Sequence, residues 1–158
     1  SNILEYSKAG AIDETQKEVS INDLVESLKK LLYVPDTISI EIKKPLPVLK
    51  GDPTKFQQIF QNLISNAIKF SDKEKGLIEI DVSESTSFYT FSIKDNGIGI
   101  KKEYHDKIFK IFQSLNKSKD SSGIGLSIVK KIIDLYGGNI WLESEPTIGT
   151  TFYFTIKK

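Results

Sequence analysis

The chain has 158 residues, of which 39% are hydrophobic, and a formal net charge of +1. That length suits one globular domain with a sizeable core. The sequence contains no cysteine, which excludes disulfides, thiol catalysis and cysteine-based zinc sites. The balanced charge gives no reason to expect nucleic acid or an anionic membrane as a partner, and no apolar run approaches the length of a membrane span. We expect a cytoplasmic domain that makes no membrane contact.

The hydrophobic pattern predicts helices and strands that follow one another along the whole chain. Helices are expected over residues 20–33, from Pro53 onward, over residues 101–109, and from Leu126 to a stop at Gly137 and Gly138. Strands are expected near residues 38–42, 48–50, 77–83, 88–94, 139–143 and 151–156. Helices interleaved with hairpin-like strands predict a two-layer α/β sandwich, in which helices cover one face of a mixed sheet.

The helix that begins at Pro53 carries two asparagines one turn apart. Apolar residues repeat every three or four positions from Phe56 to Ile68, and Asn62, Asn66 and Lys69 lie on a narrow strip beside them. Asparagine is a mediocre helix former, but its amide oxygen suits a hard cation such as Mg²⁺ that is bound mainly through substrate phosphates. The strip is either a metal-facing surface or a solvated polar face.

Asp95 follows the predicted strand at 88–94 and precedes two glycines, Gly97 and Gly99. Asn96-Gly97 is typical of a two-residue hairpin, but the predicted helix that follows argues against one. Glycines spaced by one residue allow backbone to approach a flat ligand closely. An ionised aspartate beside them accepts a hydrogen bond from an exocyclic amine, which favours adenine over guanine.

A second pair of glycines, Gly123 and Gly125, precedes the predicted helix at Leu126. The free N–H groups at a helix start attract phosphate, although a glycine pair at this place is also typical of plain capping. The polar, non-periodic segment at 113–122 between the two glycine pairs indicates either a loop that closes over a ligand or a solvated surface loop. Lysines near it, at Lys110, Lys117 and Lys119, are candidate phosphate contacts.

Taken in order, these segments resemble the motifs of one known family. Residues 62–71 resemble the N box of sensor histidine kinases, 95–99 their G1 box, 109–112 their F box and 123–126 their G2 box. Residues 138–156 are similar to the last two strands of the same catalytic, ATP-binding domain. The resemblance covers about residues 20 to 157 and implies the Bergerat fold, which this family shares with heat-shock chaperones, gyrase-type topoisomerases and mismatch-repair ATPases.

The resemblance implies ATP and Mg²⁺ as ligands and a role for each matching residue. Asn62 and Asn66 would help to hold Mg²⁺, Lys69 would approach the phosphates, and Asp95 would bind adenine, with Thr150 in support. The other residues that it places at the nucleotide are Gly97, Gly99, Ile100, Phe112, Gly123, Gly125 and Leu126.

Two departures from related sequences bear on the chemistry. The hydrolases of the wider group carry a glutamate, the base for the attacking water, where this chain has Asn62; an amide cannot take a proton, which favours phosphoryl transfer over hydrolysis. Family members often carry an arginine just after the F box, where this chain has Ser114. All 22 basic residues are lysines, so the domain offers no guanidinium clamp for the γ-phosphate.

In this family the phosphoryl group goes to a histidine on a dimerising helical hairpin. His105, the only histidine in the sequence, falls inside the short helix predicted after the G1 box, where we expect it to pack or cap locally. Residues 1–17 are interpreted as the tail of the hairpin plus a connector, and residues 18–158 as the ATP-binding domain. The expected partners are ATP or ADP, the dimerisation and phosphoacceptor domain, and a response regulator receiver domain.

Three other functions remain open from the sequence. An ATP-gated conformational switch of the chaperone or topoisomerase kind is disfavoured by Asn62. A regulator that only binds nucleotide is compatible with the missing arginine. A serine kinase similar to the anti-sigma group is disfavoured by the hairpin-like residues at the start of the chain.

Overall fold

A computed structural model describes residues 17–109 and 125–158. Its main sheet has five strands in the order β2-β4-β5-β7-β6. These strands are β2 (Ile38–Ile42), β4 (Gly76–Glu84), β5 (Phe88–Asp95), β6 (Ile140–Glu145) and β7 (Gly149–Lys157). β2 and β4 are parallel, and the other neighbours are antiparallel. The sheet is therefore mixed, as predicted.

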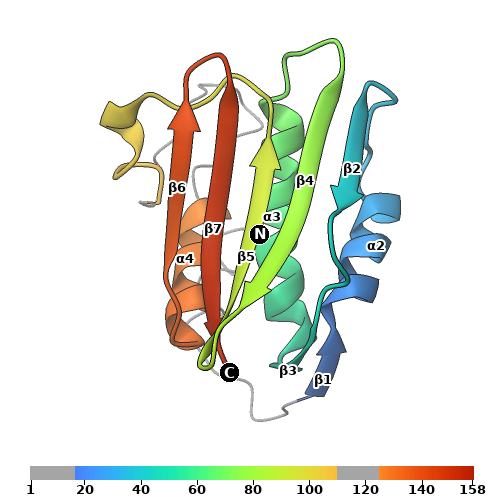
Figure 1. The fold of residues 1–158 in the computed structure, drawn as a ribbon, viewed down its shortest axis with the longest axis vertical. Coiled ribbons are helices and arrows are strands. Elements are labelled where there is room, and N and C mark those ends of the chain that lie inside the picture. Colours follow the sequence, from blue (N-terminus) through green and yellow to red (C-terminus); the bar gives the residue numbers. More distant parts are fainter. Residues whose placement is uncertain (1–16, 110–124) are drawn as a thin grey trace.

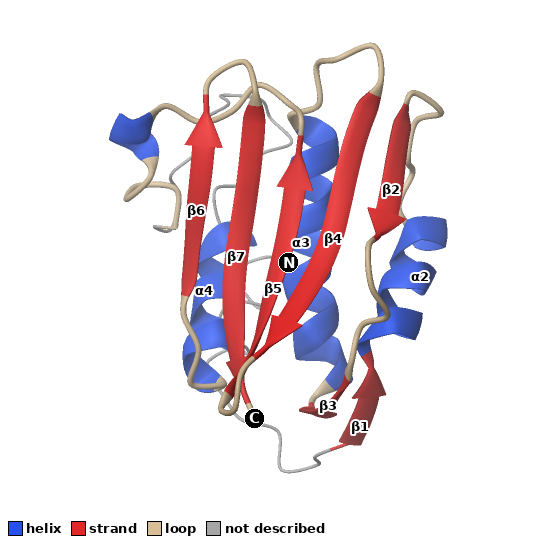
Figure 2. Cartoon of the chain, in the orientation of Figure 1, coloured by secondary structure: helices blue, strands red, loops and turns tan. Residues whose placement is uncertain are grey.

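The helices α2 (Ile21–Leu31), α3 (Pro53–Lys69) and α4 (Gly125–Leu135) lie on one face of this sheet (Figures 1 and 2). Alternating residues of the strands point toward them: Phe91 and Ile93 are buried, whereas Lys94 is exposed. This alternation is what a strand requires when only one of its faces is covered. The predicted two-layer α/β sandwich is confirmed.

The helix starts follow the capping residues of the sequence. The Ser20 hydroxyl accepts a hydrogen bond from the Asp23 N–H (3.3 Å) at the start of α2. At the start of α3 the Asp52 carboxylate accepts one from the Thr54 N–H (2.9 Å), and Pro53 occupies the first turn. Both side chains satisfy backbone N–H groups that have no partner within the helix.

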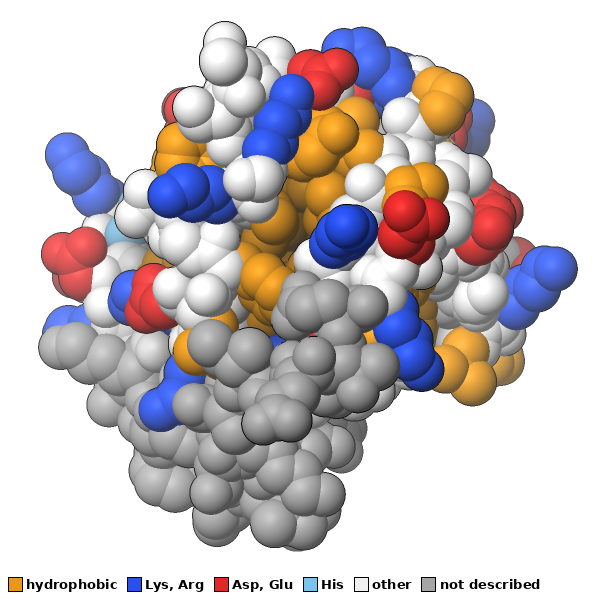
Figure 3. Space-filling view, turned by 90° about the horizontal axis from the view of Figure 1, so that it is seen from below, with side chains coloured by type: hydrophobic (Ala, Val, Ile, Leu, Met, Phe, Trp, Pro, Cys, Tyr) orange, Lys and Arg blue, Asp and Glu red, His pale blue; other side chains and the backbone are white. Residues whose placement is uncertain are grey.

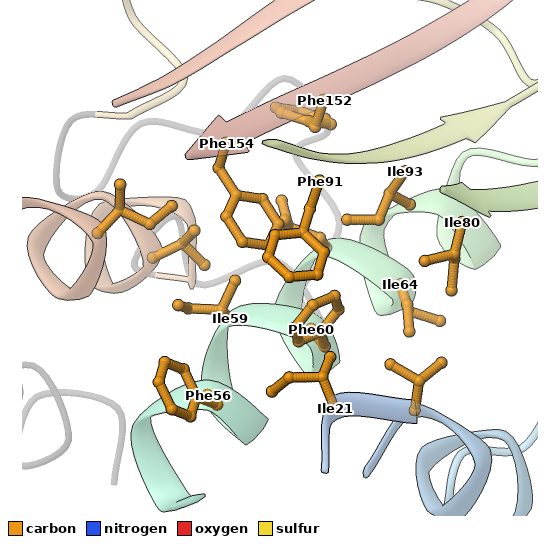
Figure 4. Packing of buried hydrophobic residues seen from close by; sticks show 14 of the residues in the cluster. Ile21, Phe56, Ile59, Phe60, Ile64, Ile80, Phe91, Ile93, Phe152 and Phe154 are labelled. Atoms are coloured by element: carbon orange, nitrogen blue, oxygen red, sulfur yellow. The ribbon is translucent and has the colours of Figure 1, made fainter. Parts of the chain in front are cut away.

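Three phenylalanines form the centre of the core between the helices and the sheet (Figure 4). Phe60 of α3 meets Phe91 of β5 and Phe154 of β7 edge-on, with ring centroids 5.5 and 5.4 Å apart, and the two strand rings stack at 5.0 Å. All three rings are almost fully buried. Because α3 is fixed to the middle of the sheet, the side chains on its flank have defined positions.

The prediction differs from the structure in two short segments. The prediction from the sequence lacks β1 (Lys17–Ser20). In the structure this strand pairs antiparallel with β3 (Val48–Gly51) in a separate two-stranded sheet. The sequence also predicted a helix over residues 101–109, where the structure has only the 3₁₀ turn η1 (Lys102–Tyr104) followed by further turns. Most of that segment is exposed, and so short a helix without a buried apolar face is not stable.

The two ends of the sandwich have different surfaces. The C-terminal end of β5 and the start of β7 lie at the top of Figure 1. Seen from below, the opposite end shows apolar side chains in a recess at its centre, with lysine and acidic side chains around it (Figure 3). The polar residues singled out from the sequence near Asp95 lie at the other end, away from this recess. No helix within residues 17–109 and 125–158 is long and apolar enough to cross a membrane.

Candidate functional site

Asp95 ends β5 and is 7% exposed. Its Oδ1 accepts hydrogen bonds from the N–H groups of Gly97 (2.9 Å) and Thr150 (3.3 Å), and the register pairs Asp95 with Thr150 across β5 and β7. Within the described part of the chain, Oδ2 makes no hydrogen bond. Burial raises the pKa of Asp95, against the lowering effect of the two N–H groups and the charge of Lys73. The protein thus fixes one carboxylate oxygen and leaves the other as an acceptor for a donor from outside.

The two glycines after Asp95 approach protein backbone closely. A Cβ on Gly97 would meet the Phe70 carbonyl, and a Cβ on Gly99, whose φ is +74°, would meet the Glu145 carbonyl. The Ile98 N–H donates to the Phe70 carbonyl (3.0 Å), so the loop is attached to the end of α3. The sequence suggested that these glycines make room for a flat ligand; at both positions the missing side chain makes room for the protein itself. A nucleotide contact by their backbone stays a prediction.

Thr150, which is 5% exposed, belongs to a network of hydroxyl groups beside Asp95. Ser144 of β6 accepts a hydrogen bond from the Ile100 N–H (2.7 Å), and its Oγ lies 2.8 Å from Thr150 Oγ1 and 3.0 Å from the Gly149 carbonyl oxygen. Ser144 was not among the site residues predicted from the sequence. Its signal was a polar residue at an inward-facing position of the strand, two residues after Leu142.

The strip on α3 has the orientation that the sequence predicted. Asn62 and Asn66 are half-buried and Lys69 is exposed. The Asn62 Nδ2 donates to the Gln58 carbonyl (2.7 Å), and because that carbonyl only accepts, the Asn62 Oδ1 must point the other way. In the described part of the chain the Asn66 side chain makes no hydrogen bond, so its amide oxygen is available to a ligand.

This donor set fits Mg²⁺ held mainly through phosphates. Two amide oxygens are hard ligands, and a metal bound by few protein groups keeps water and phosphate in its other positions. No group of three or more His, Asp or Glu side chains that could hold a metal occurs among residues 17–109 and 125–158. Asn62 and Asn66 are the candidate metal ligands on this strip because of the chemistry of their amide oxygens.

The start of α4 lies beside the asparagine strip. A Cβ on Gly125 would come within 2.9 Å of Asn62 Oδ1, and Leu126 packs against the core. At the other end of α4, the Tyr136 hydroxyl accepts a hydrogen bond from the Asp52 N–H (2.9 Å) next to the start of α3. The two helices therefore run antiparallel, and the first residue of α4 meets the middle of α3. Segments more than 60 residues apart in the sequence, at Asn62 and Gly125, are brought together.

Five of the predicted site residues lie outside the described residues: Lys110, Phe112, Lys117, Lys119 and Gly123. The first aromatic residue of the F-box segment, Phe109, is described and packs edge-on against Phe152, with ring centroids 6.2 Å apart. The His105 Nε2 lies 3.0 Å from the Ile100 carbonyl oxygen, a local contact of the kind expected for a residue that packs or caps locally.

Comparison with known proteins places these observations in a family. A family model described as "Histidine kinase-, DNA gyrase B-, and HSP90-like ATPase" matches residues 51–158. Cyanobacterial phytochrome A of a Nostoc species is 39% identical over 161 residues, which cover 98% of this chain and 21% of that protein. Histidine protein kinase 1 of Candida albicans is 36% identical over 169 residues, which cover 98% of this chain and 7% of that protein. The chain spans about a fifth of the length of the first curated relatives it matches.

Solved structures give the same result. The nucleotide-free catalytic domain of the histidine kinase ThkA superposes with a TM-score of 0.73 at 30% identity, over 91% of this chain and 98% of that one. Full-length ShkA in complex with AMPPNP superposes with a TM-score of 0.80 at 26% identity, over 98% of this chain and 34% of that one. The chain therefore belongs to the family of histidine kinase-, DNA gyrase B- and HSP90-like ATPases, and its resemblance is to the ATP-binding catalytic domain of histidine kinases.

Proposed function

We propose that this domain binds ATP with Mg²⁺ and transfers the γ-phosphoryl group to a histidine on a dimerisation domain outside this chain. The observation that carries the proposal is the Asn62 amide, whose oxygen faces Gly125 and whose nitrogen is bonded to the Gln58 carbonyl. A group in this position can hold a metal or orient a phosphate, but it cannot remove a proton from water. Because Asn62 cannot activate water for hydrolysis, the reaction proposed is transfer of the γ-phosphoryl group to an acceptor on another domain.

The proposed roles divide along the site. Asp95 Oδ2 would accept from the adenine amine, with Thr150 beside it. Asn62 and Asn66 would hold Mg²⁺, which neutralises phosphate charge and orients the γ-phosphate when it is bound. The backbone at Gly125 would contact phosphate at the start of α4, where N–H groups have no partner within the helix.

We infer the remaining partners from the same role. The acceptor histidine must arrive in line with the γ-phosphate, so the domain needs a mobile attachment to the part of the protein that carries it. The phosphorylated histidine would pass its phosphoryl group to a response regulator receiver domain. Because ATP is the substrate, the domain would work in the cytoplasm.

The test is the fate of γ-labelled ATP given to the isolated domain. The expected result is binding of Mg-ATP with little hydrolysis and no label on the domain, since no acceptor is in place. Adding the cognate histidine-bearing hairpin should place label on that hairpin in an acid-labile, base-stable bond, as in a phosphoramidate. Brisk ATP hydrolysis by the domain alone would favour an ATP-gated switch instead. Binding without any labelling of the hairpin would favour a regulator that only binds nucleotide.

A further inference from the structure

Ser144 joins three separate segments around Asp95 and Thr150, the part of the candidate site that is proposed to take adenine and is called the adenine end below. Its hydroxyl accepts from the Ile100 N–H at 2.7 Å, where the Gly97–Gly99 loop ends. It also lies within 3.0 Å of both the Gly149 carbonyl oxygen and Thr150 Oγ1, where β7 begins. No other side chain in the described residues links the loop to β7 through its hydroxyl.

The donor and acceptor in each of these contacts follow from simple counting. A serine hydroxyl has one hydrogen, and the Gly149 carbonyl can only accept, so Ser144 donates to Gly149. In the hydrogen bond between Ser144 and Thr150, the Thr150 hydroxyl must then be the donor and the Ser144 oxygen the acceptor. The Thr150 hydroxyl hydrogen is used within the protein, and its oxygen retains only acceptor capacity.

The same network reaches Asp95. The Thr150 N–H donates to Asp95 Oδ1, and the Gly97 N–H donates to the same oxygen. The loop is thus held at its start through Asp95 and at its end through Ser144, and both attachments meet on Thr150. A displacement of the Thr150 backbone would change the orientation of the carboxylate, because one of its two hydrogen bonds comes from there.

We propose that Ser144 is a positioning residue for nucleotide binding: its hydroxyl fixes the end of the Gly97–Ile100 loop on β7 and sets the Thr150 oxygen as an acceptor next to Asp95. This inference rests on the proposed function, because it assigns Ser144 to the part of the site that takes the base of a purine nucleotide. Ser144 acts through Asp95 and Thr150 and needs no contact with the nucleotide itself.

The test uses a pair of variants that differ only in the hydroxyl. Ser144→Thr keeps the hydroxyl. Ser144→Val has nearly the same shape as the threonine variant but carries a methyl group in place of the hydroxyl. Titration calorimetry with ADP should show Ser144→Val binding roughly three- to tenfold more weakly than Ser144→Thr, the range expected for one or two lost hydrogen bonds. Ser144→Ala should behave as Ser144→Val does. Ser92→Ala is the control, since Ser92 is a half-buried serine of β5 without a side-chain hydrogen bond in the described part of the chain.

A second readout separates positioning from general loss of stability. Amide exchange measured by NMR should become faster at Ile100 and Thr150 in the valine variant, and should be unchanged at Leu49 in the β1–β3 sheet. Equal ADP affinity of the threonine and valine variants would overturn the inference, and so would equally faster exchange throughout the domain. If the unaltered domain fails to bind ADP, the proposed function fails instead.

Discussion

The two halves of the candidate site differ in how far their polar groups are satisfied before any ligand binds. At the adenine end, Asp95 and Thr150 are buried and hydrogen-bonded to each other, to the glycine loop and to Ser144. On the α3 strip, Asn66 is half-buried and its side chain makes no hydrogen bond in the described part of the chain. The first half is preorganised, whereas in the second half the Asn66 side chain needs a ligand to fix it.

This difference predicts how mutations divide between folding and binding. A change at the adenine end alters contacts that the empty domain already makes, so it should change both the free energy of unfolding and the affinity for ADP. A change at Asn66 on the α3 strip removes contacts that form only with the ligand. It should leave stability nearly unchanged and reduce binding in the presence of Mg²⁺.

The largest loss of stability is expected for Gly99→Ala. Gly99 has a φ of +74°, and a Cβ there would overlap the Glu145 carbonyl. We expect a loss of about 2–4 kcal/mol in the free energy of unfolding, measured by urea denaturation, together with weaker ADP binding.

Gly137→Ala is the matched control for that change. Gly137 has nearly the same φ of +71°, but a Cβ there would meet only the Lys157 side chain, at 3.4 Å. It should lose about 1 kcal/mol, the cost of the left-handed backbone alone, and keep its affinity for ADP. Equal losses in the two variants would show that the contact with the Glu145 backbone is unimportant.

Asp95→Ala should remove recognition of adenine. Loss of a charged acceptor in a buried site is expected to cost about 1.5–3 kcal/mol, or roughly ten- to a hundredfold in affinity. Calorimetric titration with ADP measures it, with circular dichroism to establish that the variant is folded. Unchanged affinity in a folded variant would contradict the assignment of Asp95 to the base.

The pH dependence of stability and of ADP binding should run in opposite directions around Asp95. Burial raises the pKa of Asp95 in the folded domain, so its contribution to stability is present below its unfolded pKa and is lost as pH rises through its folded pKa. ADP binding needs the ionised carboxylate and should strengthen over the same interval. Melting temperature and ADP affinity, each measured across this acidic range, test the two slopes.

Asp95→Asn is the variant that isolates this titration. Its amide oxygen can still accept from Gly97 and Thr150, but it has no charge to desolvate and presents an NH₂ group in place of the second oxygen. We expect it to be at least as stable as the unaltered domain at neutral pH and to bind ADP weakly at every pH. A pH profile like that of the unaltered domain would assign the titration to another group.

The sequence predicted the elements whose signals are local. Asp52 and Pro53 define the start of α3, and the alternation from Tyr89 to Ile93 defines the buried face of β5. The missed strand β1 is only four residues long and is stabilised by pairing with β3, a partner distant in sequence. Nothing in the four residues themselves specifies that pairing, since a strand of this length takes its stability from its neighbours.

The candidate site was predictable as a set of residue types but not as a network. A pattern of asparagines, an aspartate and glycines in family order identified Asn62, Asp95 and Gly97. The sequence did not reveal that Gly97 accommodates the Phe70 carbonyl, because a ligand and a neighbouring backbone demand the same missing side chain. Nor did it reveal Ser144, whose role depends on hydrogen bonds to residues brought near only by the fold.

Asn66→Ala tests the half of the site that depends on its ligand. Because the Asn66 side chain has no hydrogen bond in the described residues, its removal should leave the melting temperature nearly unchanged. Mg-ATP binding should weaken roughly three- to tenfold, and metal-free ADP binding should weaken less. Gln61→Ala is the control, as an amide on the same helix at another angle. Equal losses with and without Mg²⁺ would mean that Asn66 contacts the nucleotide rather than the metal.

The smallest effect, a gain in stability, is expected in the turn between β6 and β7. Thr147 is the one non-glycine residue in the described chain with a positive φ (+70°), and its N–H donates to the Ile98 carbonyl at 2.7 Å. Asparagine tolerates this backbone better than a β-branched residue, so Thr147→Asn should stabilise the domain by about 0.5–1 kcal/mol in urea denaturation.

Thr86→Asn is the control, because Thr86 is an exposed turn threonine without a positive φ and should show no gain. Thr147 is exposed, and within the described residues its side chain makes no hydrogen bond to Asp95 or Thr150, so ADP affinity should not change. A gain in stability with a loss of affinity would mean that the adenine end needs this strained turn, and preorganisation would then extend from Asp95 to the surface of the domain.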